Sequence, residues 1–255
     1  MCTVSWIHDN SGYQVFFNRD EKRSRKPALS PAHAIRNGVR YIAPIDGDFG
    51  GAWIATNEFG VTCCLLNGAA GSAQRSRGWL VLDLIAMPSL SGVLKVFDET
   101  DLTLYAPFTA IALEPGTASM VFRWDGVRRV FETENGPRGM RTSSSFDTAA
   151  VLARREAVFG TAENLYTFHL SHADGASPYS VCMHRPDAET VSFSHISVSR
   201  EAAEFTYVPS APCRACQTAQ VTLTQRVPVH GEGAVTPADG AATLRASRRT
   251  RLLRG

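Results

Sequence analysis

The first 21 residues constrain the fold most, because they have the pattern of a β-hairpin that begins at a cysteine. Apolar and polar residues alternate on both sides of a dense turn signal at 9–12. A turn at this position pairs residues whose numbers sum to about 20 or 21, since the turn sets the antiparallel register. Cys2 is therefore predicted to lie opposite Asn18 or Arg19.

Cys2 is expected to become the N-terminal residue, because an aminopeptidase removes Met1 when the second residue has a small side chain. The mature chain would then begin with a thiol and an α-amine on one residue. An α-amine has a pKa of about 8 and can accept the thiol proton near neutral pH, whereas a lysine has a pKa of about 10.4. The pattern favours a nucleophile that carries its own base over an ordinary buried cysteine.

A family resemblance rests on Cys2, the run Asn18–Glu21, the run Gly50–Trp53 and the strand that ends at Asn67. Together these resemble the NRDE family, which is the family of the transport and Golgi organisation 2 proteins. Its members are similar to N-terminal-nucleophile hydrolases such as the choloylglycine and penicillin V acylases. The resemblance is strongest over residues 1–67. It implies a four-layer αββα sandwich and acyl chemistry through the N-terminal cysteine.

The charged end of the hairpin supplies candidate partners for this thiol. Arg19 would favour the thiolate or hold an anionic substrate group, and Asp20 would accept a hydrogen bond from the α-amine. Asn18 and Glu21 would orient Arg19 or line the substrate pocket. The related acylases carry Arg-x-x-Asp in this region, which leaves the assignment of these roles open by one residue. Without a site, the same residues would be edge-strand and turn residues.

Asn67 is the candidate oxyanion donor, because it ends an apolar strand and is followed by Gly68. Acyl transfer needs a neutral donor aimed at the developing oxyanion, and such a donor stabilises the transition state by about 3 to 4 kcal/mol. The related acylases also place an asparagine at the end of this strand. The alternative is that the Asn-Gly pair only makes a turn.

The serine run at 143–145 stands where the related acylases bring a second asparagine toward the substrate. Ser144 is therefore a candidate substrate-binding residue. Ser144 and Asp147 also have the spacing of a helix capping box, and capping is the favoured interpretation. A serine in place of the second amide would alter the pocket.

Four residues toward the end of the chain have some of the character of a zinc site: Cys182, His184, Cys213 and Cys216. They lack two paired Cys-x-x-Cys motifs, so buried or unreactive cysteines are predicted, with no metal and no cofactor. Cys63 and Cys64 lie in an apolar run and are predicted to belong to the core. The sequence also lacks the Gly-rich phosphate loop, the His-Glu-x-x-His motif and the Gly-x-Ser-x-Gly motif.

Charge is unevenly distributed along the 255 residues. The formal net charge is +2, but residues 241–255 contain five arginines and no acid, so the remainder carries −3. This argues against nucleic-acid binding by the folded part. We predict a single domain over residues 1–227 and a disordered, Arg-rich tail over 228–255. The sequence has no apolar run of about 20 residues, no secretory-signal pattern and no disulfide framework, which favours the cytoplasm.

The remaining periodicity predicts an α+β fold with two stacked, mostly antiparallel sheets and helices on the outer faces. Residues 23–40 are predicted to form a loop over the site. Helices are predicted over 79–87, over 90–97 with Ser89 as N-cap, and over 147–159. Strands are predicted over 40–44, 53–56, 61–66, 104–113, 119–124, 127–131, 165–170, 179–183, 190–198 and 204–208.

Two functions are consistent with these features. The favoured one is an amide or ester hydrolase or an acyltransferase that acts through Cys2 on a small-molecule substrate. The alternative is a non-catalytic carrier for a lipid or a haem-like hydrophobic ligand, which the family's association with membrane traffic and lipid handling suggests. The intact Cys2 cluster favours the enzyme, and the missing second asparagine favours the carrier.

Overall fold

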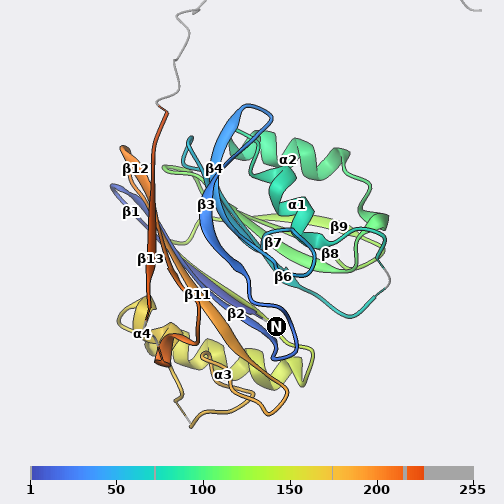
Figure 1. Cartoon of the computed structure of the whole chain (residues 1–255), viewed down its shortest axis with the longest axis vertical. Helices are drawn as coiled ribbons and strands as arrows, with labels where there is room; N and C mark the ends of the chain where they lie inside the picture. Colours follow the sequence, from blue (N-terminus) through green and yellow to red (C-terminus); the bar gives the residue numbers. More distant parts are fainter. Residues whose placement is uncertain (1, 72, 174, 215–216, 227–255) are drawn as a thin grey trace, which may run out of the picture.

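The computed structural model describes residues 2–71, 73–173, 175–214 and 217–226. The predicted tail at 228–255 and the predicted removal of Met1 lie outside the described residues. Within the described chain, the strands form two antiparallel sheets that stack face to face (Figure 1).

The six-stranded sheet carries the N-terminal hairpin at its centre. In spatial order its strands are β10 (Arg138–Ser143), β1 (Cys2–Asp9), β2 (Gly12–Lys22), β11 (Ala188–Val198), β12 (Ala202–Val208) and β13 (Ala219–Thr224). The seven-stranded sheet follows chain order: β3 (Leu29–Arg36), β4 (Val39–Ile45), β5 (Ile54–Asn57), β6 (Thr62–Asn67), β7 (Phe108–Leu113), β8 (Ser119–Trp124) and β9 (Arg129–Glu134).

Helices cover the outer face of each sheet, which gives four layers (Figure 1). On the seven-stranded sheet lie α1 (Arg77–Leu84) and α2 (Leu90–Glu99), and on the six-stranded sheet lie α3 (Thr148–Thr161) and α4 (Leu165–Leu170). Two short 3-10 turns, η1 (Leu102–Leu104) and η2 (Pro212–Arg214), complete the described elements. The predicted αββα sandwich is therefore confirmed. No helix in the described residues has the length and apolar character needed to cross a membrane.

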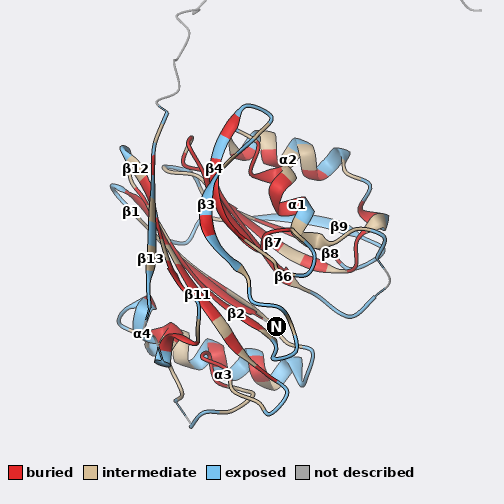
Figure 2. Ribbon diagram, in the orientation of Figure 1, coloured by how far each residue is buried: buried red, intermediate tan, exposed pale blue. Residues whose placement is uncertain are grey.

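The core lies on both faces of each sheet (Figure 2). Strand β6 shows why its sequence is apolar throughout, as predicted for a strand covered on both sides. Cys63 and Leu65 pack toward the α1–α2 layer, whereas Cys64 and Leu66 pack between the sheets. The predicted helix cap is also present, because the Ser89 hydroxyl accepts a hydrogen bond from the Gly92 N–H.

Edge strands account for several errors of the sequence-based prediction. The predicted loop at 23–40 contains β3, which is largely exposed and therefore shows little apolar periodicity. Strand β10 was not predicted, since only Met140 of its six residues is buried. Strand β13, at the other edge of the same sheet, was missed for the same reason.

Short apolar segments account for the other errors. Residues 165–170, predicted as a strand, form α4, and the Asn164 side chain caps it by accepting from the Thr167 N–H. Residues 179–183, also predicted as a strand, form turns. Runs of five or six residues are too short for periodicity to separate helix from strand.

The Gly50–Trp53 run has a packing reason. A Cβ atom on Gly51 would lie only 2.5 Å from the carbonyl carbon of Gly78, at the start of α1. The Ala52 N–H donates to the Gly78 carbonyl at 3.1 Å. The backbone of the β4–β5 connection therefore touches the backbone of α1, which only two glycines permit.

Replacing Gly51 by alanine should lower the free energy of unfolding by about 1 to 3 kcal/mol, because the new methyl group must displace backbone. Gly160→Ala is the matched control: a Cβ there meets no atom within 4 Å, and the residue lies inside α3. Gly160→Ala should raise stability by up to about 1 kcal/mol. Urea denaturation of both variants checks this, and equal effects would contradict it.

Candidate active site

The hairpin register places Cys2 directly opposite Arg19, one of the two predicted partners. On its other side, Cys2 pairs with Ser143 of β10. Residues directly opposite each other in antiparallel strands point to the same face of the sheet. The three side chains therefore form one row, on the face that looks toward the second sheet.

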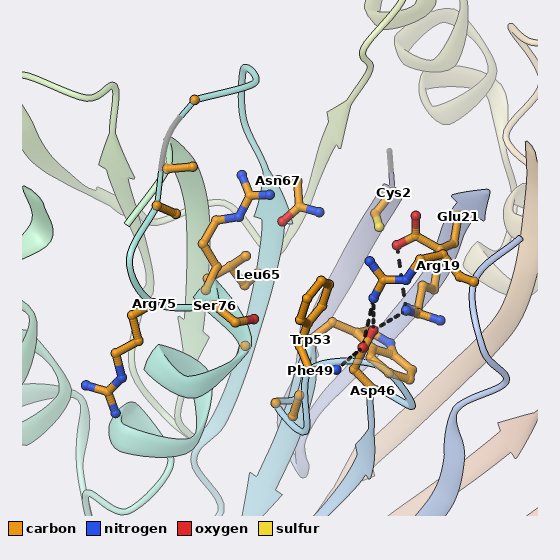
Figure 3. Close-up of a pocket in the computed structure, with 18 of the residues that line it drawn as sticks. Cys2, Arg19, Glu21, Asp46, Phe49, Trp53, Leu65, Asn67, Arg75 and Ser76 are labelled. Carbon is orange, nitrogen blue, oxygen red and sulfur yellow. Dashed lines mark hydrogen bonds and ion pairs between the residues drawn. The ribbon is translucent and has the colours of Figure 1, made fainter. Parts of the chain in front are cut away.

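A cavity of about 420 Å³ lies at the end of this row, between the two sheets (Figure 3). Four predicted site residues line it: Cys2, Arg19, Glu21 and Asn67. Asn67 comes from β6 of the opposite sheet, and in Figure 3 Cys2 and Asn67 flank the cavity. The structure thus brings together residues more than 40 positions apart in the sequence.

Asn18 lies on the other face of β2, because side chains alternate along a strand. It is fully buried, and its amide donates to the carbonyls of His169 at 2.9 Å and Val181 at 3.0 Å. Asn18 therefore anchors the α4 layer to the sheet. It does not line the cavity, which corrects its predicted place in the substrate pocket.

Asp20 is also buried behind the cavity. Its Oδ1 accepts from the Thr190 hydroxyl at 2.7 Å, and its Oδ2 lies 3.6 Å from Nη2 of Arg155. Burial raises the pKa of Asp20, and the positive charge of Arg155 opposes that rise. The negative charge of Asp20 raises the pKa of the Cys2 thiol, and a hydrogen bond from the Asp20 backbone to the sulfur partly offsets this. Asp20 therefore supports Cys2 from behind.

Arg155 of α3 is a site-supporting residue that the sequence reading missed. Its side chain is fully buried, and it donates to the hydroxyls of Thr3 at 2.6 Å and Thr142 at 2.8 Å. Its guanidinium thus joins α3 to β1, β2 and β10 immediately behind Cys2. The sequence does contain a signal for this role. Arg155 lies four residues after Val151, so it falls on the apolar face of the predicted helix.

Arg19 is held by an ion-pair network around Asp46, which the sequence reading also missed. Its Nη2 lies 2.5 Å from Asp46 Oδ2, and its guanidinium stacks 4.3 Å from the ring centroid of Trp53. Arg25 donates to the same carboxylate at 2.7 Å. Burial disfavours the Asp46 carboxylate, but hydrogen bonds from two backbone N–H groups and the two arginines lower its pKa overall. The charge of Arg19 is therefore largely compensated.

Burial raises the pKa of the Cys2 thiol, and this dominates over the lowering effect of Arg19. Arg19 acts in the predicted direction but is outweighed by desolvation. A thiol of this kind keeps its proton at neutral pH and needs a base to become a nucleophile.

The opposite wall of the cavity is organised by the Pro107 carbonyl. It accepts hydrogen bonds from the Gly68 N–H at 2.9 Å and from Arg77 Nη1 at 2.8 Å. A Cβ on Gly68 would lie 2.8 Å from the carbonyl carbon of Pro107, so this close approach requires glycine. Within the described residues, the side chain of Asn67 makes no hydrogen bond, and Arg77 makes no ion pair, although the charge of Glu21 acts on it from a longer distance.

Ser143, rather than Ser144, is the serine beside Cys2. Its Oγ is buried and has no hydrogen-bond partner within the described residues. Ser144 lies beyond the strand and hydrogen-bonds to the backbone of Phe146, so it does not line the cavity. It is not the helix cap either, because Asp147 is the N-cap and accepts from the Ala150 N–H.

Solved structures with the same fold are named as an acylase, a bile acid hydrolase and an acid amidase. The penicillin V acylase from Agrobacterium tumefaciens has a TM-score of 0.50 at 10% identity, over 80% of this chain and 82% of that chain. A mutant conjugated bile acid hydrolase from Clostridium perfringens has a TM-score of 0.54 at 11% identity, and the match covers 89% of this chain and 97% of that chain. The Caenorhabditis elegans ortholog of N-acylethanolamine-hydrolyzing acid amidase has a TM-score of 0.53 at 11% identity, and the match covers 76% of this chain and 92% of that chain. The chain therefore has the N-terminal-nucleophile hydrolase fold.

The comparison with protein-family models matches a shorter part of the chain than the solved structures do. Residues 1–126 match the family model described as Transport and Golgi organisation 2. The match confirms the resemblance drawn from the N-terminal motifs, and it includes both cavity walls from Cys2 to Asn67. A comparison with curated proteins gives no significant match.

The pH dependence of Cys2 alkylation tests the electrostatics of this site. In the wild type the midpoint for iodoacetamide modification of Cys2 should lie above the value of about 8.5 for a free cysteine. Arg19→Met should move it further upward, because Arg19 favours the thiolate. Arg123→Met, at an exposed position on β8, is the control and should leave it unchanged. A downward shift in Arg19→Met would exclude this arrangement.

Replacing Arg155 by methionine should destabilise the fold by about 3 to 5 kcal/mol, because the buried Asp20 loses the charge of Arg155. Arg154→Met is the matched control, since Arg154 is exposed and its guanidinium lies 4.7 Å from the Tyr179 ring centroid. The control should cost no more than about 1 kcal/mol. Chemical denaturation measures both, and similar losses in the two variants would refute the role of the buried pair.

Proposed function

We propose that the protein is an N-terminal-cysteine amide or ester hydrolase, or an acyltransferase, with Cys2 as the nucleophile. The observation that carries the proposal is the cavity between the sheets. It is lined by the Cys2 thiol on one wall and by the Asn67 amide, which has no hydrogen bond within the described residues, on the other. A thiol and a free amide donor across a small cavity suit attack on a carbonyl group.

In the proposed reaction, removal of Met1 frees the α-amine of Cys2. This amine accepts the thiol proton while the sulfur attacks the substrate carbonyl carbon. The Asn67 amide donates a hydrogen bond to the resulting oxyanion. The protonated amine then gives its proton to the leaving nitrogen or oxygen, and a thioester remains on Cys2. Water or another acceptor attacks the thioester, transfers a proton through the α-amine, and restores the thiol.

The raised pKa of the Cys2 thiol supports the need for this internal base. A proton that stays on sulfur at rest must be removed during attack, and the cysteine's own amine is the nearest group available in the mature chain. In this proposal Asp20 orients the amine. Thr190 and Arg155 hold the Asp20 carboxylate in place.

The charges around the cavity favour a substrate that carries an anionic group. Arg19 and Arg25 share the Asp46 carboxylate and also pair with Glu21 and Asp48, so their charges are already compensated. Arg77 lines the same cavity and makes no ion pair within the described residues. An anionic group of the substrate would therefore meet Arg77, opposite the thiol.

The carrier function remains as the alternative, and one observation favours it. Ser143 stands beside Cys2 where a second amide donor is expected from the related acylases. A carrier for a purely hydrophobic ligand fits the charged lining less well, because four arginines and two acidic residues surround the space: Arg19, Arg25, Arg75, Arg77, Glu21 and Asp46.

Two variants separate these functions, measured with a thiol-directed acyl probe and a panel of chromogenic anionic esters and amides. Intact mass should first show that the purified chain lacks Met1. Cys2→Ser should abolish probe labelling, and Asn67→Ala should lower kcat about 100- to 1000-fold, because the oxyanion loses its donor. Stability should change little, since Asn67 makes no side-chain hydrogen bond within the described residues.

Cys63→Ala is the control for labelling, because Cys63 is buried in the α1–α2 core and should not react. Labelling of Cys2→Ser at the wild-type level would show that another thiol reacts. A native chain that retains Met1 would rule out the catalytic mechanism, because Cys2 would then have no free amine. Turnover at the wild-type rate in Asn67→Ala would show that Asn67 is not the oxyanion donor.

A further inference from the structure

Four histidine and cysteine side chains from two segments, the α4–β11 connection and η2, lie close together. His172 follows α4, Cys182 and His184 lie in the segment before β11, and Cys213 lies in η2. One ligand atom from each residue lies within 4.8 Å of all the others. None of the four lines the active-site cavity.

The three separations that involve His184 Nε2 are close to the edges of a tetrahedral site. The two imidazole Nε2 atoms are 3.1 Å apart, and His184 Nε2 lies 3.6 Å from Cys182 Sγ and 3.4 Å from Cys213 Sγ. A zinc ion with ordinary bond lengths of about 2.0 Å to nitrogen and 2.3 Å to sulfur requires edges of about 3.3 Å and 3.6 Å. His184 therefore already lies at about the right distance from each of the other three ligands, and all four ligand atoms lie within 4.8 Å of one another.

The surroundings also have the character of a metal site. His184 Nδ1, the nitrogen that does not face the cluster, lies 3.7 Å from a carboxylate oxygen of Glu189. Metal-bound histidines commonly have a carboxylate near the second ring nitrogen, which fixes the ring orientation. Arg23 and Arg214 in turn pair with Glu189 and hold its carboxylate in position.

We propose that His172, Cys182, His184 and Cys213 bind one zinc ion in a structural site. Two sulfur and two nitrogen ligands in a tetrahedron are the donor set that zinc prefers. All four positions would be filled by protein, so the ion would have no open position for substrate or water. This site goes beyond the proposed function and does not depend on it.

The ion would fix a segment that has little regular structure. Between α4 and β11 the described residues form turns and one isolated bridge, from His184 to Glu189. Connections of this length without secondary structure are uncommon in compact domains, and a metal compensates for the missing backbone ladder.

The same segment reaches the support behind Cys2. The Met183 N–H donates to the Thr190 hydroxyl at 2.8 Å, and this hydroxyl donates to Asp20. The Val181 carbonyl accepts from the Asn18 amide. Both contacts are one residue away from Cys182, so the zinc ion would hold in place the layer on which Asn18 and Asp20 rest.

The sequence-based expectation of no metal is replaced by this proposal. Cys182, His184 and Cys213 were recognised as candidate ligands, but His172 was missed, because it is ten residues from the nearest of them in the sequence. Cys216, the fourth candidate from the sequence, lies outside the described residues.

Metal analysis of the full chain, purified under reducing conditions, tests the site. Elemental analysis should find about one zinc per chain, and Co²⁺ exchange should give the visible spectrum of tetrahedral cobalt with thiolate charge transfer. His172→Asn and Cys213→Ser, at half-buried and exposed positions, should bind zinc at least about 100-fold more weakly in a chelator competition. His33→Ala and Cys63→Ala are matched controls outside the cluster and should keep the zinc.

A thermal melt shows whether a variant is folded and whether the ion is structural. A chelator should lower the Tm of the wild type and of His33→Ala, and should leave the Tm of His172→Asn unchanged. Absence of zinc after reconstitution, a Cys182–Cys213 disulfide in the reduced preparation, or full zinc binding by both ligand variants would overturn the proposal.

Discussion

The register of the N-terminal hairpin is the constraint on which the site depends. Cys2 pairs with Arg19, and side chains alternate along each strand. Cys2 and Arg19 therefore face the cavity, whereas Asn18 and Asp20 face the helices. A slip of one residue would exchange the two faces and bury the thiol under α3 and α4. The apolar residues of β1, which pack between the sheets, make that slip costly.

A polar layer behind the cavity supports this arrangement. Arg155 of α3 and Asp20 of β2 meet between the six-stranded sheet and its helical layer, fully removed from water. Such a pair gains little net stability, because desolvation offsets most of the attraction, but losing one partner leaves an unpaired buried charge. The layer therefore fixes position more than it adds stability. The proposed zinc site lies at the margin of the same layer and reaches Asp20 through Met183 and Thr190.

The two walls of the cavity differ in how their charges are balanced. On one wall, Asp46, Glu21 and Asp48 neutralise Arg19 and Arg25, so these arginines shape the space more than they attract a ligand. On the other wall, Arg77 is held by the Pro107 carbonyl, a neutral acceptor, and keeps its charge available. Gly51 and Gly78 both line the cavity, and their backbones are in close contact. Three of the residues in the sequence motifs, Arg19, Gly51 and Trp53, are thus explained by how the cavity is built.

The sequence by itself determined the elements whose signal is local. The hairpin, the doubly covered strand β6 and the capped helix α2 could be predicted because turn residues and apolar periodicity act within a few positions. Edge strands such as β10 and the short helix α4 could not, because pairing and packing with distant segments decide their structure. The same holds for Asp46, Arg77, Arg155 and His172, which no local motif connects to Cys2 or Cys182. Only the tertiary structure decided which side chains share a face, a cavity or a set of ligands, because those contacts join residues far apart in the chain.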